Sequence, residues 1–454
     1  MAAKQDMGTG SVKKLLAQMV IPALVGQVIN LLYNIVDRIY IGHIPEVGAL
    51  ALTGVGLFTP ILMLITAFAM MAGSGGAPRA AIAMGQGNKE RAEQIVANCF
   101  TVLMILAVVL TAVFYVTVPG LLRLFGASDA TLPYGVAYAR VYVLGSVFVL
   151  TVMGMNSFIT AQGFAKISML TTVIGAVINI VLDPIFIFVL DLGVTGAALA
   201  TVLSQAVSAL WILRFLTGKQ TILKLKAANM KLIPEVILPC LGLGISTFVM
   251  ISTESILSVS FTSSLARYGG DVAVGAMTVL TSINQLITMP LSGIGQGSQP
   301  LISFNYGARK FDRVKEAFYS MFTVCVVYTT VFWLLLMIMP QVFAGIFTGD
   351  QALVSYASWA MRIFLGLGFS VGFQMSCQQA FMALGQAKIS LLMALLRKVF
   401  LLIPLIFILP NFFQNKAMAV FLAEPVSDII AAAVTTFMFF RFFLKLLKDN
   451  KKAE

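Results

Sequence analysis

Long, almost uninterrupted apolar stretches make up most of the chain, and short clusters of glycine, proline and charge separate them. A helix needs about 20 apolar residues to cross the hydrocarbon core of a bilayer. Only helices and closed barrels satisfy every backbone polar group there, and the alternating pattern of barrel strands is absent from this sequence. We therefore predict twelve transmembrane helices, over residues 15–41, 49–75, 95–118, 133–161, 168–190, 194–217, 236–266, 273–301, 317–345, 352–383, 390–411 and 416–444.

The composition agrees with an all-α integral membrane protein. Of the 454 residues, 59% are hydrophobic and 11% are charged, whereas a soluble domain carries about 25% charged residues. The net charge of +12 comes from Lys and Arg in short loops and at both ends of the chain. That distribution follows the positive-inside rule, so we expect both termini in the cytoplasm, a multi-pass protein of the inner membrane, and no nucleic-acid partner.

The sequence offers no constellation for catalysis or for a structural metal. The four cysteines are scattered without a CxxC pair, and His43 is the single histidine, so we expect no His-based triad or metal site within the chain. Gly218-Lys219-Gln220 lacks the other residues of a phosphate-binding loop. We expect no enzyme activity, no cofactor apart from H⁺ or Na⁺ as a coupling ion, and no ATP-driven transport.

The polar segment of residues 1–14 precedes an apolar stretch that has no small-residue cleavage site. We therefore expect that stretch to be the first helix and not a removed signal peptide.

An internal repeat divides the chain into two six-helix lobes. Residues 163–168 return at 385–390 (385 − 163 = 222), and residues 73–78 match 295–300 at the same offset. The most basic connector, residues 217–234, lies between the copies, so we place the lobes at 1–225 and 226–454. An offset of six helices gives both lobes the same topology, a parallel repeat that transporters use to build a site at the repeat interface.

Polar residues at membrane depth are concentrated in the first lobe. They are Asn30, Tyr33, Asn34 and Asp37 on one helix face, Asn156, the one-turn pair Asn179 and Asp183, and the one-turn pair Thr201 and Gln205. An ionised side chain at this depth costs about 2.5–3.5 kcal/mol on insertion scales. If Asp37 and Asp183 meet, one takes a proton or the pair holds a cation, and either event can couple transport to an ion gradient. The alternative is that Asp37 pairs with Arg38 or lies at the outer interface.

The second lobe contains a smaller set of ionisable residues. Glu254 lies near mid-depth, where it can bind a proton, a cation or a cationic substrate, or serve as a structural hydrogen-bonding group. We interpret Arg397, Lys398, Glu424 and Asp428 as a buried ion network that joins two helices. In the first helix, Pro22 removes one backbone hydrogen bond, so it forms either a conformational hinge or a static kink.

These residues resemble the multidrug and toxic compound extrusion family, in its DinF-like bacterial and archaeal branch. The resemblance covers nearly the whole chain. It is carried by Asn30…Tyr33…Val36-Asp37, Gly85-Gln-Gly-Asn88 with Glu90-Arg91, Ala161-Gln-Gly163…Lys166, Asn179…Asp183-Pro184 and Glu424-Pro425…Asp428.

The resemblance implies export of cationic or amphipathic drug-like molecules in exchange for H⁺ or Na⁺, by a monomer in the lipid bilayer. It places ion coupling on Asp37 and Asp183, assisted by Asn179, Asn156, Tyr33 and Thr201, makes Pro22 the hinge, and leaves Asn30, Asn34, Gln205 and Glu254 as candidates for the substrate cleft. Another branch of the family pairs the helix-seven glutamate with an aspartate in helix ten. Residues 352–383 contain no acid, so we expect coupling in the first lobe.

Two other functions remain. A flippase or exporter of lipid-linked saccharides or other metabolites, from the same superfamily, would need basic residues facing the central cleft, and Arg397 and Lys398 are the only deep basic candidates. A membrane scaffold or enzyme is not supported by any motif.

Overall fold

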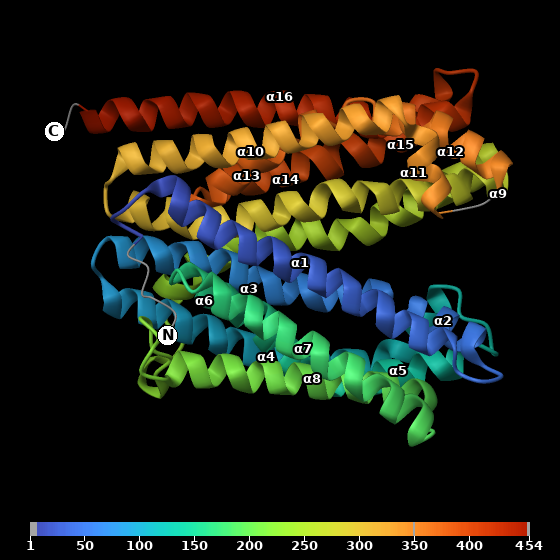
Figure 1. Cartoon of the computed structure of the whole chain (residues 1–454), viewed down its shortest axis with the longest axis horizontal. Helices are drawn as coiled ribbons and strands as arrows, with labels where there is room; N and C mark the ends of the chain where they lie inside the picture. The colour runs from blue at the N-terminus through green and yellow to red at the C-terminus, as the bar shows by residue number, and fades with distance from the viewer. Residues whose placement is uncertain (1–6, 348–349, 452–454) are drawn as a thin grey trace.

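The computed structural model describes residues 7–347 and 350–451, which form two layers of helices that diverge toward one end of the molecule (Figure 1). The first layer contains α1 (Val12–Gly42), α2 (Gly48–Gly56), α3 (Thr59–Gly85), α4 (Lys89–Leu124), α5 (Leu132–Leu144), α6 (Ser146–Ala161), α7 (Ala165–Pro184), the π-helical turn η1 (Ile185–Val189) and α8 (Gly193–Thr217). After the 3₁₀ turn η2 (Ala227–Asn229), the second contains α9 (Pro234–Gly307), α10 (Phe311–Ile338), α11 (Pro340–Phe347), α12 (Gln351–Phe364), α13 (Ser370–Ala383), α14 (Ala387–Leu395), the π-helical segment η3 (Leu396–Leu402), α15 (Ile403–Ile408), η4 (Leu409–Asn411) and α16 (Lys416–Lys451).

The helices account for the predicted twelve spans in two lobes. Among the described residues, nine helices are long and apolar enough to cross a membrane, or ten if α5 and α6, which are bent by 58°, form one span. Helix α9 runs for 74 residues, far more than one span needs, and Gly270 interrupts it with φ 65° and ψ −164°. It is therefore two spans, 234–269 and 271–307. Helices α12 and α13 together cover the predicted span 352–383.

Several helices extend beyond the apolar stretches that predicted them. Helix α4 begins at Lys89 and not near residue 95, because the Asn88 side chain accepts a hydrogen bond from the Arg91 backbone N–H and caps the helix. Helix α3 continues to Gly85, ten residues past the predicted end. Hydropathy marks the part of a helix that contacts lipid, so polar turns outside the membrane escape it.

The two lobes exchange the beginnings of their first helices. Residues Val12 to Val20 of α1 pack in the hydrophobic core of the second lobe, whereas Ile41 at the other end packs in the core of the first. The repeat-related α9 does the reverse, with Val236 and Cys240 in the first lobe's core. The predicted boundary at residue 225 stays a prediction, but each core uses residues from both sides of it.

The lobes meet most closely at the end of the bundle where α1 begins and α16 ends, which we call the terminal end (Figure 1). The main contact there is between α3 and α9. A Cβ added to Gly85 would lie 1.9 Å from the Phe304 carbonyl oxygen, and one added to Gly307 would lie 2.0 Å from that of Ile82. Only glycine permits backbones to approach so closely.

Candidate functional site

A cluster of buried polar side chains forms where α1, α7 and α8 meet. Asp183 is fully buried, and its Oδ1 accepts a hydrogen bond of 3.1 Å from Asn179 Nδ2. The same amide nitrogen lies 3.4 Å from Thr201 Oγ1 on α8. The carboxyl group of Asp37, on α1, lies close to that of Asp183. The structure therefore brings together four residues that the sequence singled out from three separate helices.

The two carboxyl groups leave acceptors unsatisfied. Asp37 Oδ1 and Asp183 Oδ2 are buried and have no hydrogen-bond partner among the described residues. An ionised carboxylate only accepts hydrogen bonds, and two of them repel each other strongly away from water. One shared proton would relieve the repulsion and turn one oxygen into a donor, and a small cation would neutralise both charges. Binding of either ion would therefore be favourable at this pair.

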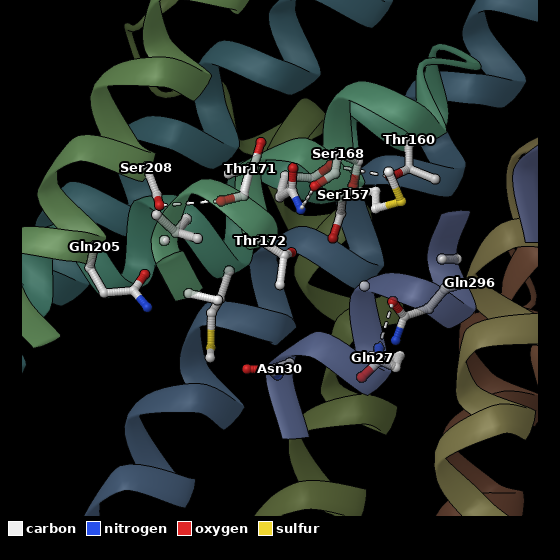
Figure 2. A pocket seen from close by; sticks show the side chains of 18 of the residues that line it. Gln27, Asn30, Ser157, Thr160, Ser168, Thr171, Thr172, Gln205, Ser208 and Gln296 are labelled. Carbon is white, nitrogen blue, oxygen red and sulfur yellow. Dashed lines mark hydrogen bonds between the residues drawn. The ribbon is translucent and has the colours of Figure 1, made fainter. Parts of the chain in front are cut away.

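This cluster adjoins a cavity of about 290 Å³ in the first lobe, part of which Figure 2 shows. Tyr33, Gly175 and Gln205 line the cavity, and each lies one helical turn from Asp37, Asn179 or Thr201 respectively. These three helices therefore lead from the cavity to the carboxyl cluster within a single turn.

The described residues that line the cavity include many polar side chains and no charged one. Gln27, Asn30, Ser157, Thr160, Ser168, Thr171, Thr172, Gln205, Ser208 and Gln296 line it, with apolar residues that include Met70, Met153 and Met169. Asn156 Oδ1 and Gln205 Oε1 are buried acceptors without a partner among the described side chains. A ligand that donates hydrogen bonds would satisfy both oxygens.

Residues from both lobes reach this cavity. Gln27 Nε2 on α1 and Gln296 Oε1 on α9 are 3.4 Å apart, and a dashed line joins them in Figure 2. Pro22 also lines the cavity, and α1 remains helical through it, so its role as a hinge stays a prediction. Asn34 lies outside the lining, where it donates to the Asn30 carbonyl oxygen at 2.6 Å.

Two tyrosines beside the carboxyl cluster were missed in the sequence. Tyr138 and Tyr142 on α5 are buried and stacked, with ring centroids 6.1 Å apart. Tyr138 lies beside Thr201. The one-turn spacing of the two tyrosines could have marked them in the sequence. Buried tyrosines are common in protein cores, however, so only the folded structure shows that they lie beside the carboxyl cluster.

Both lobes match the same protein-family model. The MatE family model matches residues 22–185 and again residues 245–408, so that one model covers each lobe. The chain belongs to the MatE family. The double match also follows the internal repeat.

Curated relatives of this MatE protein include multidrug export proteins named MepA. The one from Staphylococcus saprophyticus is 24% identical over 87% of this chain and 86% of its own length. The one from Staphylococcus aureus strain N315 is 25% identical, with the same shares of both chains covered.

Solved MATE structures share the fold over nearly the whole chain. A multidrug resistance MATE family transporter of the MOP superfamily, in an outward-facing conformation, has a TM-score of 0.90 and 25% identity, and covers 98% of this chain and 99% of its own. A MATE protein in a bent conformation has the same TM-score and identity, with 97% of each chain covered. Proteins of this family are transporters and not enzymes.

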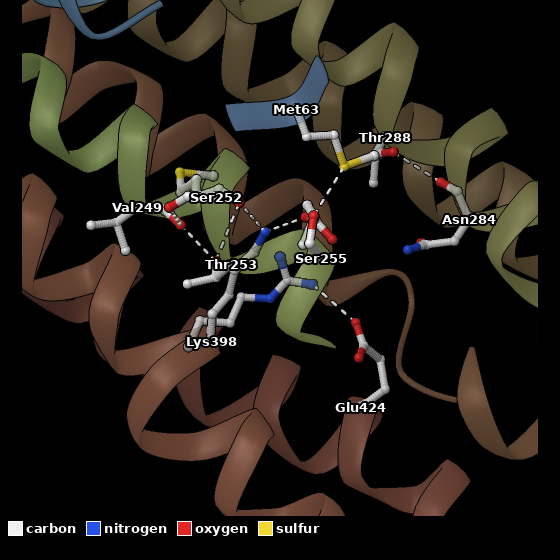
Figure 3. A network of polar contacts seen from close by, with 12 residues as sticks. Met63, Val249, Ser252, Thr253, Ser255, Asn284, Thr288, Lys398 and Glu424 are labelled. Atoms are coloured by element: carbon white, nitrogen blue, oxygen red, sulfur yellow. Dashed lines mark hydrogen bonds and ion pairs between the residues drawn. The ribbon is translucent and has the colours of Figure 1, made fainter. Parts of the chain in front are cut away.

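In the second lobe of the MatE protein, the predicted ion network is present and larger than expected. Arg397 Nε lies 2.7 Å from Asp428 Oδ1, and its Nη2 lies 3.3 Å from Glu424 Oε1. Lys398, the next residue, forms an ion pair with Glu254 on α9 and donates to the Met250 carbonyl oxygen at 2.6 Å. Figure 3 shows Lys398 and Glu424 within this network.

The structure adds Glu254 to that network. Glu254 pairs with Lys398 and is not among the residues that line the cavity of Figure 2. Its side chain is 53% exposed, so its place in the substrate cleft stays a prediction. The π-helical segment η3 carries Arg397 and Lys398, and from it their side chains reach α16 and α9 respectively. Spacing on a regular helix could not predict that divergence.

We expect Arg397→Gln to destabilise the protein. The substitution leaves Glu424 and Asp428, whose side chains are each 8% exposed, without their cation. Breaking a buried ion pair by removing one partner costs about 3–5 kcal/mol. Thermal unfolding of the purified protein should show a clear fall in Tm. Arg123→Gln is the control, because its pair with Asp129 is exposed and such pairs contribute about 0–1 kcal/mol. Equal Tm values for the two variants would show that the network is not structural.

Proposed function

We propose that this MatE protein is a secondary active exporter of amphipathic or cationic small molecules, driven by protons that enter through Asp37 and Asp183. The single observation that carries the proposal is the pair of carboxyl groups one turn from a ligand-sized cavity on the same helices. Binding of an ion to this pair and binding of a substrate in this cavity would require different positions of the same helices, so each would weaken the other. Antiport of substrate against ion needs this negative coupling between the two sites.

The lining of the cavity supports the class of substrate. The unpaired acceptors Asn156 Oδ1 and Gln205 Oε1 suit a molecule with N–H or O–H donors. The methionines of the lining are flexible and polarizable, so they adapt to apolar groups of different shapes. The curated relatives named as multidrug export proteins support the same class.

A flippase for lipid-linked saccharides is the second candidate, and the basic residues argue against it. Lys and Arg are absent from the described residues that line the cavity. Arg397 and Lys398, the deep basic residues, are engaged by Glu424, Asp428 and Glu254. An anionic pyrophosphate carrier would therefore meet no free cation in this cavity.

We place the terminal end on the cytoplasmic side of the inner membrane, and we propose that the protein works as a monomer. The basic loops and the positive-inside rule support this orientation. The lobes touch at the terminal end through α3 and α9 and diverge at the other (Figure 1). With this orientation, the space between the lobes opens to the outside of the cell. An exporter has this conformation when it releases its substrate.

Dye efflux from proteoliposomes tests the function. Purified protein is reconstituted, a cationic fluorescent dye is loaded, and either a pH gradient or a Na⁺ gradient is imposed. We expect efflux with the pH gradient, and we expect a protonophore to stop it. Efflux driven by Na⁺ alone would transfer the coupling role to Na⁺, and efflux that continues without any gradient would refute active exchange.

A further inference from the structure

A second cavity lies between the lobes at the terminal end, away from the cavity of Figure 2. Its volume is about 360 Å³, and Gln86, in the turn between α3 and α4, is one of the residues that line it. The first lobe contributes Arg79, Ile82, Ala83, Gln86, Arg91 and Ile95, and the second contributes Tyr306, Leu384, Gly385 and Gln386. A ligand bound here would contact both lobes.

Two guanidinium groups give this cavity an uncompensated positive charge. Arg79 Nε is buried and has no hydrogen-bond partner among the described residues. Arg91 uses one nitrogen, Nη2, to donate to the Glu235 carbonyl oxygen at 2.6 Å. The described lining contains no acidic side chain. Buried arginine donors are usually paired, because an unpaired one loses its hydration without replacement.

The repeat provides an internal comparison. Arg313 is the equivalent of Arg91 in the second lobe, and its guanidinium is fully engaged. Its nitrogens donate to Asn305 Oδ1 at 2.9 Å and to the carbonyl oxygens of Gly10 and Met7 at 2.7 and 3.1 Å. The equivalent of Arg79 is Leu301, so the second lobe carries neither the extra cation nor the free donors. The charged cavity is specific to one side of the pseudo-symmetric molecule.

We propose that this cavity binds a phosphate-type anion, either a free phosphate or the headgroup of an anionic phospholipid. Arginine forms bidentate, charge-assisted hydrogen bonds with phosphate oxygens, and two arginines at one cavity wall suit a doubly charged group. Gln86 and Gln386 line the cavity from opposite lobes. Because the site exists only while the lobes touch, occupancy stabilises the conformation that is closed at the terminal end.

Binding of inorganic phosphate and of dioctanoyl-phosphatidylglycerol to the full-length protein in neutral detergent tests the proposal. Isothermal titration should show saturable binding to the wild type, and dioctanoyl-phosphatidylcholine should not bind at this site. Displacement of phosphate by the anionic lipid at lower concentration would assign the site to a headgroup, whereas phosphate binding without displacement would assign it to a soluble anion. Both outcomes support the site.

Arg79→Gln is the decisive variant, because the loss of Arg79 Nε breaks no hydrogen bond to the part of the chain that the structure describes. We expect its affinity for phosphate to fall at least about tenfold, as the loss of a charge-assisted bond implies, and Arg79→Lys should be intermediate. Lys315→Gln removes one exposed charge outside the cavity and should bind as the wild type does. Equal affinities for wild type and Arg79→Gln, or no saturable binding to the folded wild type, would overturn the proposal.

Discussion

Asp37→Asn and Asp183→Asn should each reduce gradient-driven dye efflux to the level of protein-free liposomes while the protein still inserts and folds. Asparagine keeps the size of the side chain and its hydrogen bonds, but it cannot gain or release a proton at the relevant pH. Each carboxyl group has an oxygen without a partner among the described residues, and the two groups lie close to each other. Removing either one therefore removes the shared ion site.

Folding of these variants is expected to survive, because each substitution removes repulsion between the half-buried Asp37 and the buried Asp183. The introduced side-chain amide can donate to the carboxyl group that remains, which replaces the shared proton. A Tm equal to or above that of the wild type is the expected result. The double variant should be no more defective in transport than either single variant, since residues that act as a unit are not additive.

Asp129→Asn is the matched control, because this carboxylate is fully exposed and is not among the residues that line the cavity. It should transport as the wild type does. Substantial efflux by both Asp37→Asn and Asp183→Asn under a pH gradient would show that this pair does not couple transport to protons. Glu254 would then be the next candidate for the coupling residue.

How much the sequence predicted depends on whether a feature is periodic. The spans follow from hydropathy, and the meeting of Asp37 with Asp183 follows from one-turn spacings on polar helix faces combined with the family resemblance. The neighbouring Tyr138 could not be predicted, because it comes from a helix whose contact with Thr201 is purely tertiary. The pairing of Glu254 with Lys398 was missed for a related reason, since η3 is not a regular helix.

The duplication explains why the scaffold was easier to predict than the chemistry. Equivalent backbone positions make equivalent contacts, as Gly85 with Phe304 and Gly307 with Ile82 do. Side chains have diverged: Asp37 corresponds to Val259 at the repeat offset. Close packing requires a glycine in both halves, but one ion site is enough for coupling.

Valine in place of Gly244 should prevent the lobes from closing at the terminal end. A Cβ on Gly244 would lie 1.8 Å from the Met71 carbonyl oxygen, and one on Gly75 would lie 2.0 Å from that of Cys240. The obstructing atoms belong to the backbone, so no side-chain rotation can relieve the overlap. Helices α3 and α9 must separate, and a strained fit of this kind costs about 1–3 kcal/mol or more. Efflux should be lost, because an exporter that cannot close this end cannot alternate between its two conformations.

Cys240 reports the separation directly, since it is fully buried at this crossing in the described conformation. In a background with Cys99, Cys325 and Cys377 replaced by alanine, a water-soluble maleimide should label Cys240 slowly in the parent protein and much faster in Gly244→Val. Gly242→Val is the matched control on the same helix, because a Cβ on Gly242 meets no atom within 4 Å. It carries the same change in helix propensity, so any difference between the two variants isolates the contact between α3 and α9. Equal labelling and equal efflux for the two variants would mean that this glycine contact does not control closure.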